Sequence, residues 1–313
     1  MKLIKKSHPS FYLLFLMGMV RIGLASEEIT PLTQAGQRIE DHYTQQLTIL
    51  SEDLKRVVLS ESEAKSQKLT RFLASDNLDP KLVKFVILNE ATPRALAEFG
   101  QQGKNHFSLL ESLFNDPKLM RQMLVADGAR AQRMGRKGYG PPKYGKAMEI
   151  YSKIQDSCKD ATTGIFQRLA LAISLEHAVP VVQTNPAEDT NAPETVDPVK
   201  RYHHYKKACL DGELDSTFKN LSTWDLRMVV NGDEPDETLS WGREMLRNYR
   251  PDHIYNENFG WRYVAIVGSD VKYGSGDVKY DRPELQKYQN ILMNGGVCGR
   301  RAFFGRFILR AFG

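Results

Sequence analysis

Residues 294–305 read Asn-Gly-Gly-Val-Cys-Gly-Arg-Arg-Ala-Phe-Phe-Gly, and this stretch decides which fold the sequence predicts. Cys298 follows a pair of glycines and precedes an apolar run that reaches Gly313, which predicts a helix beginning at the cysteine. A helix N-terminus stabilises a thiolate through its unpaired N–H groups and the positive end of its dipole. Arg300 and Arg301 oppose that dipole, so their position favours a role beside a thiolate. The alternative is that Cys298 is a buried, small apolar side chain.

Placing successive residues about 100° apart predicts which sides of this helix are buried. Ala302 and Gly305 share the face of Cys298, and apolar side chains cover the rest except for a narrow basic strip at Arg306 and Arg310. We therefore expect a buried central helix. Since Ala302 and Gly305 are small, we expect a strand or sheet to pack against this face and to bring a base to the sulfur.

The run Gly-Gly-Val-Cys-Gly, with Ala302, Phe303 and the closing Leu309–Gly313, resembles the nucleophile segment of the transglutaminase-like superfamily. The resemblance is specific over residues 261–313 and fainter over 146–261. It implies a papain-like domain in which the cysteine opens a central helix and the following sheet carries a His and an Asp. The expected fold is therefore a mainly α N-terminal region followed by an incomplete α+β transglutaminase-like domain.

The same resemblance implies acyl transfer through a thioester. The Cys298 thiolate attacks an amide of a protein or peptide, ammonia or an amine leaves, and the acyl group passes to water or to an amine. The backbone N–H of Cys298 is the expected oxyanion donor, with the side chain of Asn294 as a second donor. Asn290 and Gln289 are alternatives to Asn294. No metal or organic cofactor is implied.

All seven histidines precede Cys298, so the order Cys, His, Asp of the resembling family is not met. One interpretation is a chain truncated after the nucleophile helix. A second is a non-catalytic secreted binding or structural protein that keeps the fold. A third is that His253 or His177 has taken over as the base, with Asp252 or Asp270 as an orienting acid.

The first 25 residues have the pattern of a secretory signal peptide. Lys2, Lys5 and Lys6 precede an apolar core at 11–20, and residues 23–25 offer a small-residue cleavage site. The core is shorter than the roughly 20 residues that span a bilayer, which disfavours a membrane anchor. We expect a secreted or extracytoplasmic protein without membrane insertion after cleavage. Removing 1–25 lowers the formal charge from +5 to +1, so composition gives no case for nucleic-acid binding.

Three cysteines in a secreted chain leave one unpaired. We expect a disulfide between Cys158 and Cys209 that leaves Cys298 free, and the alternative is three reduced thiols. Asn220 begins a glycosylation sequon that has meaning only in a eukaryotic secretory route.

Composition divides the rest of the chain. The expected regions are a helical bundle at 26–127, a Gly/Pro-rich basic loop at 128–145, a helix pair at 146–179, a linker at 180–198 and the transglutaminase-like domain at 199–313. Within the last region, Ser222 and Asp225 predict a capping box, Pro235 predicts a helix start, and residues 261–267 predict a strand.

Two further groups allow more than one interpretation. His203 and His204 suggest a metal, although neighbours on a helix diverge by about 100° and an amphipathic helix surface explains them too. An aromatic series suggests either a glycan or peptide groove or the core and rim of the second domain. Its members are Trp241, Tyr249, Tyr255, Phe259, Trp261 and Tyr263.

Overall fold

The computed structural model describes residues 30–58, 78–133, 136–183, 194–274 and 280–313. The predicted signal peptide, residues 1–25, lies outside the described residues. Contacts divide the chain into Met1–Pro31 and Leu32–Gly313, and all the elements below belong to the second unit. Within the described ranges, no helix is long and apolar enough to cross a membrane.

The first half of the unit is a series of helices. They are α1 (Gln34–Val58), α3 (Leu78–Ala91), α4 (Pro93–Gly100), α5 (Lys104–Phe114) and α6 (Pro117–Ala126). Both α4 and α6 begin with a proline behind a capping side chain, because Thr92 Oγ1 accepts the Ala95 N–H at 3.3 Å and Asp116 Oδ1 accepts the Leu119 N–H at 2.9 Å.

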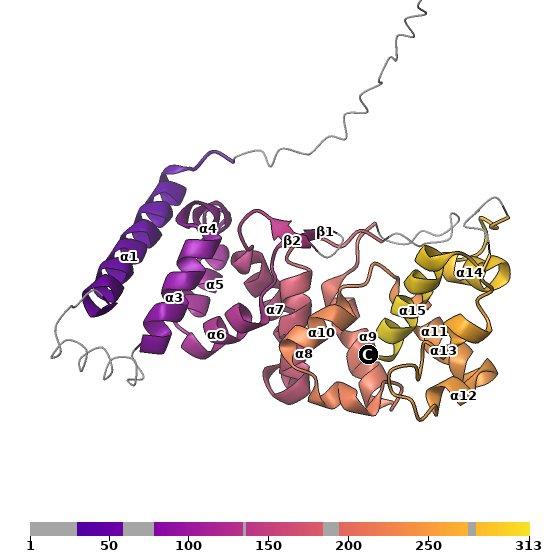
Figure 1. Ribbon diagram of the computed structural model, residues 1–313. Helices are drawn as coiled ribbons and strands as arrows, with labels where there is room; N and C mark the ends of the chain where they lie inside the picture. Colours follow the sequence, from indigo (N-terminus) through magenta and orange to yellow (C-terminus); the bar gives the residue numbers. More distant parts are fainter. Residues whose placement is uncertain (1–29, 59–77, 134–135, 184–193, 275–279) are drawn as a thin grey trace, which may run out of the picture. The chain divides into compact units, whose positions relative to one another are not determined.

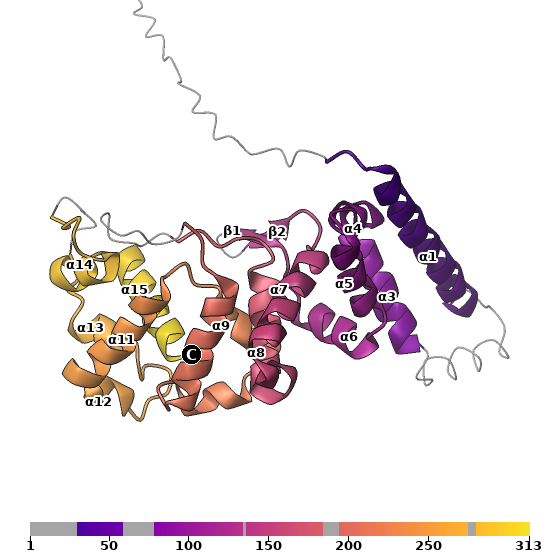
Figure 2. The same ribbon diagram turned by 180° about the vertical axis from the view of Figure 1, so that it is seen from behind.

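A short antiparallel pair, β1 (Ala131–Arg133) and β2 (Arg136–Tyr139), lies in the predicted basic loop. Next come α7 (Tyr144–Ser157), the 3₁₀ turn η1 (Lys159–Thr162) and α8 (Gly164–Glu176). Helices α7 and α8 lie side by side (Figure 1, Figure 2). Every residue of α8 from 169 to 175 is buried, so α8 is a central helix of the unit.

The remaining elements are again helical. They are α9 (Pro198–Leu210), η2 (Ser216–Asn220), α10 (Thr223–Val230), α11 (Asp236–Tyr249), α12 (Pro251–Ile254), α13 (Ala265–Ser269), α14 (Lys287–Asn294) and α15 (Cys298–Phe312). The capping box is confirmed, since Ser222 and Asp225 exchange both hydrogen bonds, and α11 begins directly after Pro235.

The expected α+β, papain-like architecture is wrong. Residues 261–264 form turns, 265–269 form α13, and the described part of 199–313 has no sheet beyond an isolated bridge between Tyr273 and Gly296. Val264 and Val267 both lie against Gly305 of α15. Residues three apart share a helical face but point to opposite sides of a strand, so this packing selects the helical form.

Helix α15 is buried along one broad face, not nearly all round as expected, because Cys298, Ala302 and Leu309 are exposed. Phe307 stacks on Tyr288 with ring centroids 3.9 Å apart, and Phe312 stacks on Tyr263 at 4.2 Å. Gly242 lets α11 approach α15, because a Cβ there would lie 2.6 Å from the Phe307 ring. Arg310 was expected on an exposed strip, but it is buried and pairs with Glu234 at 3.5 Å.

Two side-chain donors and one backbone donor satisfy the carbonyls at the end of α15. The Tyr205 hydroxyl donates to Arg310 O at 2.9 Å, and Arg243 Nη1 donates to Ala311 O at 2.8 Å. The Asp215 N–H donates to Phe312 O at 2.8 Å. The last carbonyls of a helix have no partner within it, so these donors fix the end of α15.

The end of α10 is held in the same way. Arg201 is fully buried and donates to Val230 O at 3.4 Å and Gly232 O at 3.1 Å, as well as to Glu234 O. Its Nε also pairs with the Asp236 carboxylate. One guanidinium therefore joins α9 to the whole turn between α10 and α11.

We predict that Arg201→Met lowers the free energy of unfolding by about 3–5 kcal/mol, because it leaves the half-buried Asp236 carboxylate and several carbonyls without their donor. Urea denaturation of the full chain followed by circular dichroism measures this change. The matched control is Lys207→Met on the same helix, whose exposed ion pair with Asp211 contributes less than about 1 kcal/mol. Equal midpoints for the two variants would contradict the prediction.

Candidate functional site

Cys298 is the first residue of α15, as the sequence predicts, and its side chain is exposed. Val297 precedes it without providing a side-chain cap. Among the described residues, the N–H groups of Cys298, Gly299 and Arg300 have no hydrogen-bond acceptor. A Cβ added at Gly299 would meet nothing within 4 Å, so the space before the helix is open. The sulfur thus lies beside three unpaired donors that an incoming group can reach.

The two glycines before the cysteine fit the backbone to a neighbouring segment. Gly295 has φ of 71°, and a Cβ there would lie 2.3 Å from Lys272 O. The Gly296 N–H donates to Lys272 O at 3.0 Å, and Gly296 O accepts the Gly274 N–H at 3.3 Å. These glycines therefore set the position of the first turn of α15 and leave the space before its N-terminus open.

Arg300 and Arg301 join the same turn to two further segments of the chain. Arg300 makes two hydrogen bonds to Asp281, at 3.0 and 3.1 Å, and Arg301 donates to Val271 O. Asn294 Nδ2 also donates to Asp281, at 2.8 Å. Burial favours the neutral acid, but Arg300 and Asn294 outweigh it and keep the pKa of Asp281 below its usual value. The predicted oxyanion donor Asn294 is thus engaged with this carboxylate.

Among the described residues, no sheet packs against the face of α15 that carries Cys298. Ala302 is exposed. A Cβ added at Gly305 would lie 3.4–3.5 Å from the side chains of Val267 in α13 and of Val264 just before it. The small residues were expected to admit a strand that brings a base. They instead admit a short helix on one part of the face and leave the part around the cysteine exposed.

The two histidines proposed as bases lie elsewhere. No hydrogen bond or ion pair joins any described histidine to Cys298. His177 is buried and bonds Val230 O through Nε2 at 3.1 Å, while its buried Nδ1 has no partner among the described residues. Burial, and then the charge of Arg201, lowers the pKa of His177 to about 4. His177 is a neutral, structural side chain at neutral pH.

His253 lies in an ion-pair cluster that includes both predicted acids. Its ring nitrogens are 3.7 Å from Asp252 and 3.6 Å from Asp270, and Arg250 pairs with both carboxylates. Ser269 Oγ is 3.2 Å from His253 Nε2, but its hydroxyl donates to Asp270 at 2.8 Å. The serine proton is therefore directed at the carboxylate, and the cluster is an arginine-centred ion-pair group, not a nucleophile with its base.

His203 and His204 point to different neighbours. His203 Nε2 is 3.0 Å from Ser157 Oγ, whereas His204 Nε2 lies 3.3 Å from the guanidinium of Arg243. Burial, followed by the charge of Arg243, lowers the pKa of His204 to about 3. Across the described ranges, no three His, Cys, Asp or Glu side chains are grouped to hold a metal ion.

The aromatic series divides between core and surface. Trp241 stacks on Phe307 and Tyr263 stacks on Phe312, so these two rings support α15. The other four side chains are exposed: Tyr249, Tyr255, Phe259 and Trp261.

All three cysteines are free thiols in the structure, so the expected pairing of Cys158 with Cys209 is not formed. Cys209 is buried, and its burial raises the pKa of its thiol. Cys158 is half-buried at the end of α7, where Lys206 Nζ donates to its sulfur at 2.9 Å. Sequence reasoning missed this lysine, because α7 and α9 meet only in the folded chain.

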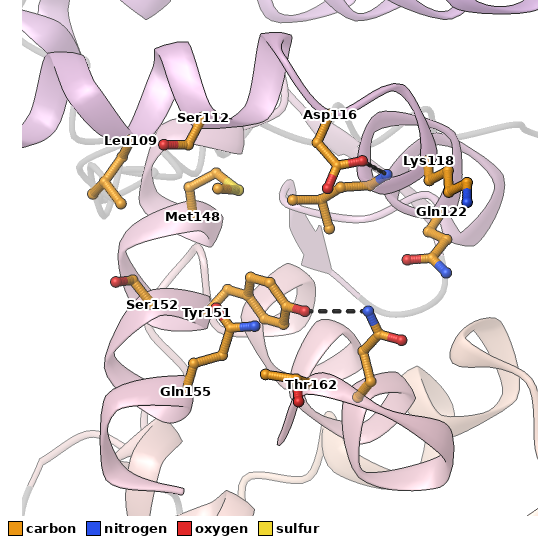
Figure 3. A pocket seen from close by; sticks show the side chains of 12 residues that line it. Leu109, Ser112, Asp116, Lys118, Gln122, Met148, Tyr151, Ser152, Gln155 and Thr162 are labelled. Atoms are coloured by element: carbon orange, nitrogen blue, oxygen red, sulfur yellow. Dashed lines mark hydrogen bonds between the residues drawn. The ribbon is translucent and has the colours of Figure 1, made fainter. Parts of the chain in front are cut away.

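A cavity of about 510 Å³ is a second feature that sequence reasoning missed. Figure 3 shows it between α5, α6, α7 and α8, with the Tyr151 ring among the side chains that line it. Most of its polar lining consists of amides and hydroxyls, and Gln167 Nε2 donates to Tyr151 Oη at 3.4 Å. The lining is Leu109, Ser112, Asp116, Lys118, Leu119, Gln122, Met148, Tyr151, Ser152, Gln155, Thr162 and Gln167.

Comparisons with models of known families, with curated proteins and with solved structures find no match to this chain. The resemblance of residues 261–313 to transglutaminase-like proteins therefore stays a prediction from sequence.

We predict that His177 makes the protein acid-sensitive. Its pKa is lowered in the folded state, so its contribution is complete above the unfolded value near pH 6.5 and is lost as pH falls toward 4. His177→Gln keeps a donor for Val230 O but removes the titration. The free energy of unfolding of the unmutated protein should therefore fall up to roughly 3 kcal/mol further than that of the variant between pH 7 and pH 4. Urea denaturation at several pH values measures this pH dependence. The control is His42→Gln, at an exposed histidine. If the free energy of unfolding of His177→Gln depends on pH as that of the unmutated protein does, the prediction is wrong.

Proposed function

We propose that this chain acts through Cys298 as the nucleophile of an acyl-transfer reaction on protein or peptide amides. The observation that carries the proposal is the exposed thiol at the first position of α15, beside N–H groups that have no acceptor in the described residues. A preorganised helix N-terminus favours negative charge on the sulfur and on an oxygen bound next to it.

The rigidity of α15 supports the same assignment. Its last turn receives donors from Tyr205, Arg243 and Asp215, and its first turn is held to neighbouring segments by Arg300 and Arg301. The thiol is therefore presented by a fixed backbone, which is what a nucleophile needs to meet a carbonyl carbon at a defined angle.

In the proposed reaction, the Cys298 sulfur forms a bond to the amide carbonyl carbon, and the carbonyl oxygen takes the negative charge. The backbone N–H of Cys298 donates to that oxygen. The C–N bond then breaks, the amine leaves with a proton, and a thioester remains. Water or an amine attacks the thioester, the C–S bond breaks, and the thiol is restored.

The proposal assigns the nucleophile and one oxyanion donor. Neither His177 nor His253 is assigned as the general base, because both are bound to other groups. The proposed reaction does not require a papain-like sheet. The pattern of residues 1–25 leads us to propose that the reaction takes place outside the cytoplasm.

An activated peptide ester tests the nucleophile directly, because its leaving group needs no proton from the protein. We predict that the full chain forms a thioester on Cys298, detected by intact mass and peptide mapping, and that Cys298→Ser abolishes this adduct. Cys158→Ser is the matched control and should retain it. Acylation of all three thiols at equal rates, or only after denaturation, would reject the proposal.

A second candidate function is binding of an uncharged peptide without chemistry, favoured by the cavity of about 510 Å³. Its amide side chains offer both donors and acceptors, which is the combination that a peptide backbone requires. The two charged groups of its lining, Asp116 and Lys118, lie at the start of α6, where Asp116 is already occupied in capping.

We predict that a short peptide with both ends blocked binds this cavity and that Gln155→Leu weakens the binding about fivefold or more, because a buried polar group of the peptide loses its partner. Calorimetric titration measures the change. Gln102→Leu, on an exposed glutamine outside the cavity, should bind as the unmutated chain does; equal affinity of the Gln155 variant would exclude the cavity as the site.

A further inference from the structure

The sulfur of Cys158 lies in a group of polar side chains contributed by two helices. Cys158 follows the last residue of α7, and Lys206 and Tyr202 lie one turn apart on α9. Lys206 Nζ donates to the sulfur at 2.9 Å, and the Tyr202 hydroxyl donates at 3.7 Å. Lys206 Nζ also pairs with Asp160 Oδ2 at 2.7 Å. Cys158, Lys206 and Asp160 thus form a chain of thiol, amine and carboxylate.

The electrostatics of this group favour an ionised sulfur. Burial favours the neutral thiol, but hydrogen bonds from Lys206, Tyr202 and the Asp160 N–H outweigh it and lower the pKa of Cys158. The hydrogen bond that Lys206 donates to Asp160, and then the one that it donates to Cys158, raises the pKa of Lys206. Burial raises the pKa of Tyr202, so its hydroxyl stays a donor. These hydrogen bonds favour a thiolate–ammonium pair over a neutral thiol beside the ammonium.

The three cysteines differ in what surrounds them. Cys209 is buried, and burial raises the pKa of its thiol. Cys298 is exposed, but none of the described side chains donates to its sulfur. Only Cys158, among these, combines solvent access with a cation in hydrogen-bond contact. Thiolate character together with access determines which cysteine an oxidant attacks.

The geometry points to Cys158 and Lys206 as a modification site for hydroperoxides, in which the oxidised sulfur is captured by the lysine amine as a covalent S–N cross-link. This inference is independent of the acyl transfer proposed for Cys298. It concerns a different sulfur, on a different pair of helices.

The chemistry balances in two steps. The thiolate attacks one oxygen of hydrogen peroxide, the O–O bond breaks, and with one proton the products are a sulfenic acid and water; sulfur is oxidised by two electrons and the peroxide is reduced. The Lys206 amine, after losing its proton to solvent, attacks the sulfenic sulfur. An S–N bond forms, the S–O bond breaks, and a second water leaves. The protein has then lost two hydrogen atoms in total.

The position of Lys206 favours its attack on the oxidised sulfur of Cys158 over reaction of that sulfur with groups from solution. Lys206 Nζ is already within hydrogen-bond distance of the sulfur, with 16% of its side chain exposed, and Asp160 and the ring of Phe166 lie beside it. A neutral sulfenic acid no longer stabilises the ammonium, so proton loss from Lys206 becomes easier once the sulfur is oxidised. The cross-link would join the end of α7 to the middle of α9.

The test is to treat the full chain with hydrogen peroxide and follow intact mass and peptide maps, with dimedone added to trap any sulfenic acid. The expected product has lost two hydrogen atoms, carries Cys158 joined to Lys206, and returns to the starting mass with dithiothreitol. Cys158 should react at least about tenfold faster than Cys209 or Cys298.

Substitutions of Lys206 separate the two roles of the amine. Lys206→Arg keeps the cation but removes the nucleophilic nitrogen, so oxidation should stay fast and dimedone should now label Cys158. Lys206→Met removes both, so oxidation should slow by about tenfold with no cross-link. Lys207→Met, the exposed neighbour, should behave like the unmutated chain, and Cys298→Ser should still cross-link.

Three outcomes would overturn the inference. They are oxidation of Cys298 or Cys209 at the rate of Cys158, equal rates in Lys206→Met and the unmutated chain, and a dimedone-reactive sulfenic acid that persists while Lys206 is present. Failure of acylation at Cys298 would leave all three measurements unchanged, so the two proposals are tested separately.

Discussion

Buried arginines that donate to carbonyls at helix ends are the interaction on which the C-terminal half of this protein depends. A helix leaves its last carbonyls without partners, and burying them without donors is costly. Arg201 supplies Val230 O, Arg227 supplies Ala126 O, and Arg243 supplies Ala311 O. Each guanidinium is itself buried and bound to a carboxylate, so its charge is compensated. The arginines and the helix-end carbonyls therefore stabilise each other. Removing an arginine leaves buried carbonyls without a donor, and removing its carboxylate leaves a buried positive charge without a partner.

The contacts that hold the last turn of α15 lie at the opposite end of the helix from Cys298. Its last turn is fixed by Tyr205 and Arg243, and Tyr205 also donates to Val229 O, which joins the ends of α10 and α15. These contacts lie at the C-terminal end of the helix, about 20 Å along the axis from its first residue by the rise per residue. Cys298, at the opposite end, makes no such contact among the described residues, so a change of its side chain leaves the network intact.

Local signals in the sequence predicted local structure well. The capping box at Ser222, the helix start after Pro235 and the helix beginning at Cys298 each depend on residues within four positions of one another. The strand expected at 261–267 was wrong because a short apolar run fits either period, and the choice is made by Gly305, which is distant in sequence. Arg310 was placed on the surface for the same reason: its partner Glu234 comes from the turn before α11. The pairing of Cys158 with Lys206 and the cavity beside Tyr151 require the packing of α7 and could not be predicted.

The cysteines show how far identical side chains diverge once the fold is set. At Cys209 the surroundings are apolar, and the neutral thiol is favoured. At Cys158 a lysine and a tyrosine offer hydrogen bonds that only a negative sulfur uses fully. At Cys298 the nearby donors are the backbone N–H groups at the start of α15, which have no acceptor among the described residues. A side-chain cation such as Lys206 is committed to the thiolate, whereas free backbone donors can follow negative charge from sulfur to a carbonyl oxygen. That difference is why we propose redox chemistry at Cys158 and acyl transfer at Cys298.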